Sequence, residues 1–193
     1  MEKLLDKKVL ILSTSQSLFA QFGLKKVTTD DIAEQARISK ATIYKFYRNK
    51  TEIFEDVIQM EFDELFDLIK IAVNKEKTTI NKFRAHLITK FSILHDLVNF
   101  YNVTRDNWNQ FWPYIVEYRR QYVIREQTIV KDIIKFGNDR NELKVKDIDL
   151  TSYLMVMALK SMELPWVIEE IKISQEKYID SMLTLIMNGI KRR

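Results

Sequence analysis

Cationic hydrogen-bond donors are concentrated in one short segment that contains no acidic side chain. Every charged residue between Ala36 and Thr51 is a lysine or an arginine, whereas every charged residue from Glu52 to Asp67 is acidic. Ammonium and guanidinium groups bind phosphate oxygens and the O6 and N7 acceptors of guanine, and hydroxyl groups hydrogen-bond to both kinds of acceptor. The chemistry that this segment offers is therefore the binding of a polyanion.

The local sequence indicates how these donors are positioned. Residues 28–50 are typical of two short helices across a tight turn, in which Thr28 or Thr29 can cap the first helix and Ser39 can cap the second. Apolar residues at i, i+3 and i+4 from Ile43 form an inner stripe on the second helix, and basic and hydroxyl side chains occupy the rest of its surface. This layout is that of a helix-turn-helix motif, whose second helix enters the major groove of DNA.

The composition of the whole chain favours long helices. The 193 residues are 46% hydrophobic and 30% charged, with three glycines, two prolines and no cysteine. Few breakers and little turn chemistry argue against a β-rich fold, and the absence of cysteine excludes disulfides and thiolate metal sites. The net charge of +4 is by itself weak evidence for nucleic acid. We therefore expect an all-α protein.

Hydrophobic spacing predicts the order of the helices. A first helix from Leu4 to Phe22 ends at Gly23, and Asn49 with Glu52 resembles a capping box that opens a long helix to about Val73. The expected helices beyond it cover 79 to about 99, about 105 to 136 (with Pro113 at a start or a kink), 149–164 and 174–190. Residues 137–147 form the clearest loop, and Pro165 is expected to interrupt or end its helix.

The motif also has a family resemblance. The stretches SLFAQFG, TTDDIAEQARIS and KATIYKFYRNKTEIF, between about Val9 and Val57, resemble the N-terminal domain of the TetR family of bacterial transcriptional regulators. The resemblance implies a homodimer whose two recognition helices enter successive major grooves of a near-palindromic operator. It also implies a divergent C-terminal domain that binds an inducer and supplies the dimer interface. The expected domains are a DNA-binding domain at 1–50, a connecting helix at about 50–73, and a ligand-binding and dimerisation domain at 74–193.

Carried over position by position, the resemblance places Thr28, Thr29, Tyr44 and Lys50 at phosphates, and it places Ser39, Lys40, Ala41, Thr42 and Lys45 at or beside the groove. The side-chain chemistry of Arg48 also suits a phosphate. Two residues depart from the pattern of the relatives. Phe46 stands where many relatives have histidine or tyrosine, so that it offers only apolar contact or stacking if it faces DNA. Arg37 stands at a turn position where relatives often have glycine, and a left-handed backbone there would cost roughly 1 kcal/mol.

The C-terminal half contains many aromatic residues, for which two interpretations remain open. They line a pocket for an apolar or aromatic small molecule, or they form an ordinary core. The candidate ligand-binding residues are Phe91, His95, Tyr101, Trp108, Phe111, Trp112, Tyr118, Tyr122 and Trp166.

The last two expected helices are apolar over more than one stripe. They therefore supply a dimer interface, the core of their own monomer, or both. The candidate interface residues are Leu154, Met157, Ala158, Ser161, Ile179, Met182, Leu183 and Ile186.

Other function classes find little support. His86 and His95 lie nine residues apart, which is not the spacing of two metal ligands on one helical face, and no nucleotide-binding or nucleophile motif is present. We therefore predict no metal, no cofactor and no enzymatic activity, and the short N-terminal apolar run predicts a cytoplasmic protein. The leading prediction is a dimeric DNA-binding repressor that a small apolar or aromatic ligand releases. The alternatives are a helix-turn-helix regulator without an inducer and a helical enzyme or carrier protein.

Overall fold

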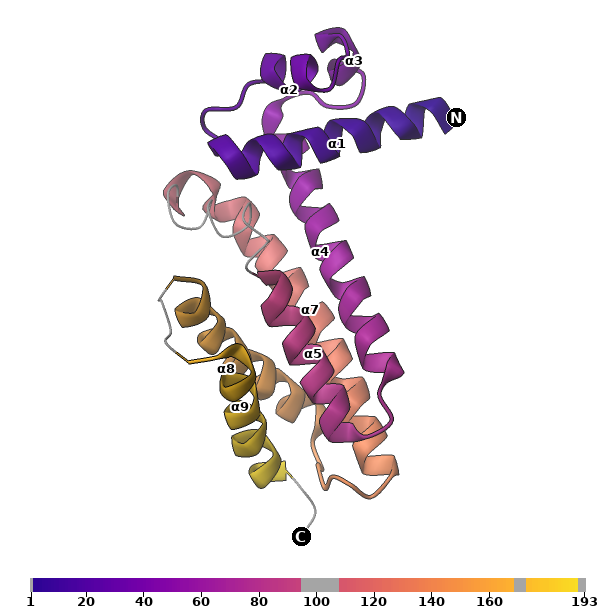
Figure 1. Cartoon of the computed structure of the whole chain (residues 1–193), viewed down its shortest axis with the longest axis vertical. Coiled ribbons are helices and arrows are strands. Elements are labelled where there is room, and N and C mark those ends of the chain that lie inside the picture. Colours follow the sequence, from indigo (N-terminus) through magenta and orange to yellow (C-terminus); the bar gives the residue numbers. More distant parts are fainter. Residues whose placement is uncertain (1, 95–107, 169–172, 191–193) are drawn as a thin grey trace. The chain divides into compact units, whose positions relative to one another are not determined.

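The computed structural model describes the backbone of residues 2–94, 108–168 and 173–190, and the side chains of 6–93, 120–161 and 173–189. Every element in this part of the chain is a helix, which confirms the predicted all-α fold (Figure 1). The helices are α1 (Glu2–Phe22), α2 (Thr29–Gln35), α3 (Lys40–Tyr44), α4 (Lys50–Lys75), α5 (Thr79–Leu94), α7 (Trp108–Asp139), α8 (Ile148–Ile168) and α9 (Gln175–Ile190).

Local capping chemistry fixes the ends of the N-terminal helices as the sequence predicts. Gly23 follows α1 with φ of 79°, and its N–H donates to the carbonyl oxygen of Phe19 at 2.9 Å. Thr28 is the N-cap of α2 and Ser39 is the N-cap of α3. At the start of α4 the amide oxygen of Asn49 accepts a hydrogen bond from the N–H of Glu52 at 3.0 Å. The Glu52 carboxylate accepts from the N–H of Arg48 rather than from that of Asn49, so the predicted box is only half formed.

Two predicted helix ends are wrong. The helix α7 continues through Gly137 to Asp139. Gly137 does not end the helix; a glycine is needed at this position because other side chains pack closely against it. A Cβ atom at this position would lie 2.7 Å from the Leu143 side chain and 2.8 Å from the Thr79 side chain. The chain turns only after α7 ends, where Asn141 adopts a left-handed φ of 58°. The helix α8 likewise continues past Pro165 to Ile168, and α7 begins at Trp108, so that Pro113 does not mark its start.

The chain divides into two compact units, between which α4 and α7 are shared. The first contains α1, α2, α3, the part of α4 up to Asp63, and α7 up to Tyr118. Its core includes the buried side chains of Ile11, Ile32 and Ile43. The rings of Phe19 and Phe54 meet edge to face with their centroids 5.5 Å apart, so that α4 packs against α1. This core is the support on which the helix-turn-helix segment rests.

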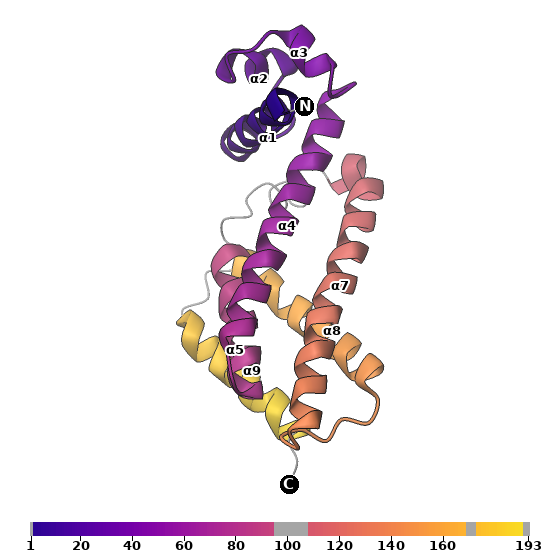
Figure 2. The ribbon, with the colours of Figure 1, turned by 90° about the vertical axis from the view of Figure 1, so that its right-hand side faces the viewer.

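The second unit holds the remainder of α4 and α7 together with α5, α8 and α9. Helices α5 and α9 lie side by side in both views (Figures 1 and 2). The rings of Phe91 and Tyr178 meet with centroids 6.0 Å apart, and Arg84 pairs with Asp180 at 3.3 Å. None of the described helices is long and apolar enough to cross a membrane.

A fully buried charged cluster joins α5 to α7 in the second unit. The Glu126 carboxylate accepts a hydrogen bond from the Lys90 ammonium and lies 3.2 Å from Nε2 of His86. Burial by itself raises the pKa of Glu126, but the charge of Lys90 and the proximity of His86 outweigh burial, and the pKa is lowered. The carboxylate is therefore ionised at neutral pH inside an apolar core.

Candidate nucleic-acid interface

Backbone hydrogen bonds stabilise the turn between α2 and α3, and one residue of the turn has a strained backbone. The N–H of Ile38 donates to the Ala33 carbonyl oxygen at 3.0 Å, and the N–H of Arg37 donates to that of Glu34 at 3.0 Å. Arg37 has φ of 53°, so the turn places a non-glycine residue in the left-handed region. This conformation costs about 1 kcal/mol. Arg37 therefore differs in sequence from the glycine that is often found at this position, and its backbone conformation is less favourable.

The helix α3 has the buried and exposed faces that its apolar stripe predicts. Ile43 and Tyr47 are buried, and the Tyr47 hydroxyl donates to the Asp56 carboxylate at 3.0 Å. Burial, together with that hydrogen bond, raises the pKa of Tyr47. Phe46 is half-buried, so that part of its ring stays accessible.

Most of the predicted DNA-contacting side chains are exposed. The exposed members of the set are Thr28, Ser39, Lys40, Ala41, Tyr44, Lys45 and Arg48, and the half-buried members are Thr29, Thr42, Phe46 and Lys50. Tyr44 has half of its surface accessible, at 50%. An exposed tyrosine next to the buried Ile43 is available for a partner outside the chain.

Hydroxyl groups order the N-terminal end of α3. The Ser39 hydroxyl accepts from the N–H of Thr42 at 3.2 Å, and the two side-chain oxygens of these residues lie 2.8 Å apart. The helix therefore starts with a fixed geometry next to the exposed methyl group of Ala41. The predicted base-reading residues thus lie on a short helix whose first turn is already in place.

Lys40 carries its charge in a surface ion pair. Its ammonium lies 2.8 Å from the Asp30 carboxylate, and the hydrogen bond to Asp30 raises the pKa of Lys40. Both side chains are exposed, and solvent screens such surface pairs so that they add little to stability. DNA acceptors can therefore replace Asp30 as the partner of Lys40 at little cost.

The N-terminus of α2 brings Thr29 next to Tyr44 of α3, with the two hydroxyl oxygens 3.5 Å apart. The Thr28 side chain is engaged differently, because it accepts from the N–H of Asp31 at 3.2 Å while the Asp31 carboxylate accepts from the backbone N–H of Thr28 at 2.7 Å. These backbone and side-chain hydrogen bonds lower the pKa of Asp31. Thr29 and Tyr44 are therefore better placed than Thr28 to share one phosphate.

Lys50 has a geometry that its sequence position does not reveal. Its ammonium donates to the carbonyl oxygens of Val27 at 2.5 Å and Leu24 at 2.6 Å, and lies 3.5 Å from that of Lys25. Burial lowers its pKa, opposed by the charge of Asp31. Lys50 thus ties the loop between α1 and α2 to the start of α4, and its contact with phosphate stays a prediction.

The predicted ligand residues fall largely outside the described side chains. His95 and Tyr101 lie outside the described residues, and so do the side chains of Trp108, Phe111, Trp112, Tyr118 and Trp166. Phe91 and Tyr122 are described, and both are buried in the second unit. A groove of about 470 Å³ lies elsewhere in this unit, between α4 and α7. The residues of this groove were not predictable from the sequence, because the charged and apolar side chains that form it are spread over three helices.

The predicted interface residues divide into two groups. The first group, in α9, is buried within its own chain and consists of Ile179, Met182 and Leu183. This burial agrees with the second interpretation, in which these residues form the core of their own monomer. Leu154, Ala158 and Ser161 of α8 are exposed, and Met157 and Ile186 are half-buried. Among the described residues, no group of three or more His, Asp or Glu side chains is arranged to hold a metal ion.

Comparison with known proteins finds a family model that matches the N-terminal segment of the chain. Residues 11–57 match the model of the bacterial regulatory proteins of the tetR family. A Bacillus subtilis protein, the uncharacterized HTH-type transcriptional regulator YhgD, is 39% identical over 61 residues, which are 32% of this chain and 32% of that protein. The chain thus covers about a third of the length of this relative.

Solved structures match over nearly the whole chain. A transcriptional regulator from Cytophaga hutchinsonii has a TM-score of 0.79 at 21% identity, covering 96% of this chain and 99% of that one. The transcriptional regulator FadR from Bacillus subtilis, solved in complex with stearoyl-CoA, has a TM-score of 0.74 at 20% identity, covering 94% and 98%. These likenesses extend the shared fold beyond the N-terminal match.

Proposed function

We propose that the chain is a regulator of the TetR family, namely a DNA-binding transcriptional repressor that binds a near-palindromic operator as a homodimer; the match of residues 11–57 to the family model supports this. One observation carries the proposal: α3 buries Ile43 and holds exposed lysine, hydroxyl and tyrosine groups on its outer surface. An exposed recognition helix of this composition matches the acceptors of a major groove and its flanking phosphates.

The side chains divide by the part of DNA that each would contact. Lys40, Ala41 and Thr42 at the ordered start of α3 read base edges, with Ser39 and Lys45 beside them. Tyr44 and Thr29 bind one phosphate from two helices, and Arg48 binds another. Phe46 contributes apolar contact at the rim.

The exposed apolar residues of the second unit support the dimer. Leu150, Tyr153 and Leu154 share one side of α8, and Leu154 is 56% accessible, while Leu185 of α9 is 73% accessible. Exposed apolar side chains of this kind become buried when two copies pair about a two-fold axis. We place Leu154, Ala158 and Ser161 in this interface, and we leave Ile179, Met182 and Leu183 in the monomer core.

The release of DNA by a small molecule completes the proposal. The likeness to a FadR solved with stearoyl-CoA supports a ligand with a long apolar part. Residues of α4 belong to both units, so a ligand in the second unit would act on the first through this helix. The cytoplasm, where bacterial operator DNA is found, is the proposed location. No catalytic step is included.

The test is the binding of the full chain to duplex DNA, measured by fluorescence anisotropy over a range of salt concentrations. Lys40→Ala is expected to reduce discrimination between operator and mutated operator roughly tenfold, which is the effect of losing one good base contact. The control is Lys77→Ala, which removes an equal charge from an exposed residue between α4 and α5. Equal discrimination by both variants would contradict the base-reading role.

A further inference from the structure

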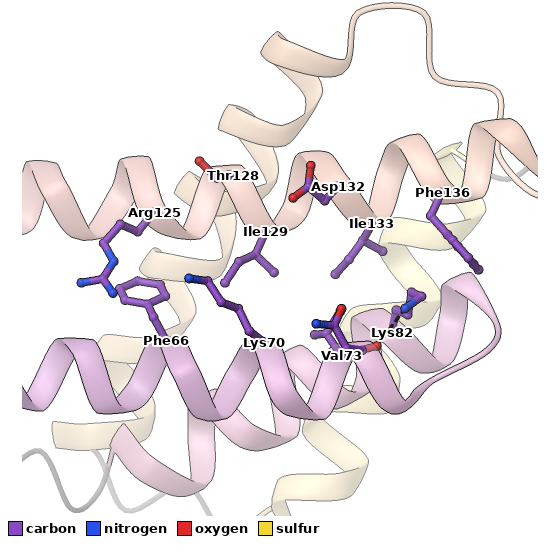
Figure 3. Close-up of a pocket in the computed structure, with 11 residues that line it drawn as sticks. Phe66, Lys70, Val73, Lys82, Arg125, Thr128, Ile129, Asp132, Ile133 and Phe136 are labelled. Carbon is purple, nitrogen blue, oxygen red and sulfur yellow. Dashed lines mark hydrogen bonds between the residues drawn. The ribbon is translucent and has the colours of Figure 1, made fainter.

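A groove between α4 and α7 has the size of a ligand site. Its volume of about 470 Å³ lies within the range of roughly 300–1,000 Å³ that is usual for small-molecule sites. All of its lining residues belong to the second unit, and they come from α4, α5 and α7. Figure 3 shows that Ile129 and Ile133 of α7 point into the space between the helices.

The groove carries an excess of positive charge. Lys70, Lys82 and Arg125 line it together with a single carboxylate, that of Asp132, so that the net charge of the lining is +2. Lys70 and Arg125 lie beside Phe66 at one end of the groove (Figure 3). The Arg125 guanidinium lies 4.5 Å from the centroid of the Phe66 ring, and this stacking fixes its position.

The other end of the groove is held differently. The Lys82 ammonium donates to the Val73 carbonyl oxygen at 2.8 Å and lies 4.8 Å from the centroid of the Phe136 ring. Lys82 therefore caps the end of α4 and adds positive potential from a fixed position. At the end with Arg125, the Lys70 ammonium lies 4.0 Å from the exposed Asp67 carboxylate, a weak surface pair that an anionic head can replace.

The space between these ends is apolar. Val73, Ile129 and Ile133 are buried side chains of the lining, and they form its floor. From Arg125 to Phe136 the helix α7 rises about 16 Å at 1.5 Å per residue. A ligand that fits has an anionic head at one end and an extended apolar body, because a uniformly polar anion would leave the floor without contacts.

We propose that this groove binds an amphiphilic carboxylate, with its head at Lys70 and Arg125 and its alkyl or aryl part along Ile129 and Ile133. The net charge of the lining disfavours a cationic head, and a neutral head would forgo the charge-assisted hydrogen bonds. Binding of this ligand to the protein without DNA does not depend on the proposed function. Only its consequence for operator release depends on that function.

The test uses isothermal titration of the full chain, without DNA, with decanoate and decyltrimethylammonium below their micelle-forming concentrations and with decan-1-ol below its solubility in water. Decanoate is expected to bind most tightly, and added salt is expected to weaken decanoate without affecting decanol. Lys70→Gln should weaken decanoate roughly three- to tenfold. Asp132→Asn should strengthen it roughly two- to fivefold, because it removes the one carboxylate of the lining.

The control is Lys75→Gln, which removes the same charge from an exposed residue of α4 that does not line the groove. The two lining residues chosen are exposed, so thermal unfolding of each variant is expected to match the parent. The proposal is overturned if decanoate does not saturate the protein, if decanol binds equally well, or if Lys70→Gln and Lys75→Gln have equal effects. If decanoate binds the chain as expected but does not change the affinity for the operator, the proposed release by a ligand is wrong and the proposed binding site in the groove is not.

Discussion

At the scale of single residues, the side chains of the DNA-facing segment have two kinds of task. Tyr44 and Lys40 present polar groups outward, whereas Lys50 donates inward to the loop before α2. The sequence does not indicate which of these side chains points outward and which points inward. The carbonyl oxygens that accept hydrogen bonds from the Lys50 ammonium lie 23 to 26 residues away in the sequence. Local caps such as Ser39 were predictable, since each partner lies within one helical turn.

Lys50→Ala is expected to lower the free energy of unfolding by about 1–3 kcal/mol, because part-buried carbonyl oxygens lose their donor. Chemical denaturation measures the change. Lys45→Ala, at an exposed lysine of the same segment, should change stability by less than about 0.5 kcal/mol. If Lys50→Ala instead kept full stability and lowered the salt slope of DNA binding by about one, the phosphate role would replace the structural one.

Arg37→Gly is expected to stabilise the protein by roughly 0.5–1 kcal/mol, since glycine adopts the left-handed φ of 53° without steric cost. Asn141→Gly, at φ of 58°, is the matched comparison, and it should gain less because asparagine tolerates this region. Thermal unfolding of both variants gives the measurement. A loss of stability in Arg37→Gly would mean that the arginine side chain makes contacts that outweigh the strain.

At the scale of helices, the order of elements was predictable from hydrophobic spacing and capping residues, but two boundaries were not. A glycine usually marks the end of a helix, yet Gly137 lies inside α7. The residue is a glycine because the side chains of Leu143 and Thr79 approach it too closely for a Cβ atom. The helix α5 begins at Thr79, as predicted, but the hydrogen bond that caps it was not predictable. The N–H of Thr79 donates at 3.1 Å to the carboxylate of Glu142, 63 residues later, and no local pattern indicates this cap. Contacts of this kind exist only after the helices have packed.

Gly137→Ala is expected to destabilise the protein by about 1–3 kcal/mol, because the new methyl group would overlap the buried Leu143 and Thr79 side chains. Gly189→Ala is the control within a helix. A Cβ atom there meets nothing within 4 Å, so the variant should gain up to about 1 kcal/mol of helix propensity. Urea unfolding curves compare the two, and equal gains would show that α7 does not pack closely at this glycine.

At the scale of the whole molecule, the fold joins a local reading motif to a body whose stability depends on a buried charge. The N-terminal motif has a strong sequence signature, whereas the His86, Lys90 and Glu126 cluster and the groove between α4 and α7 arise from residues distant in sequence. A histidine, a lysine and a glutamate on amphipathic helices have no signature that distinguishes a buried cluster from a solvated face. This difference explains why the kind of function was easier to predict than the ligand site.

Glu126→Gln is expected to destabilise the protein by about 3–5 kcal/mol at neutral pH, because it leaves the buried Lys90 charge uncompensated. The folded pKa of Glu126 lies below the ordinary value of 4.5, so its contribution is complete above that pH and is lost as the pH falls. The parent should therefore lose stability on acidification more steeply than Glu126→Gln. Thermal unfolding across this range gives the comparison, and adding Lys90→Met to the variant should recover part of the loss.

Selection of bound sequences from a pool of random duplexes, with the full chain, shows whether α3 reads the sequence of duplex DNA. We expect enrichment of a near-palindrome whose half-sites lie about 34 Å apart, or a multiple of one helical turn. Under the same conditions Lys40→Ala should enrich a site with relaxed preference within each half-site, and Tyr44→Ala should retain the same site with weaker binding. A pool that stays random for the parent protein, or half-site preferences that Lys40→Ala leaves unchanged, would contradict this expectation.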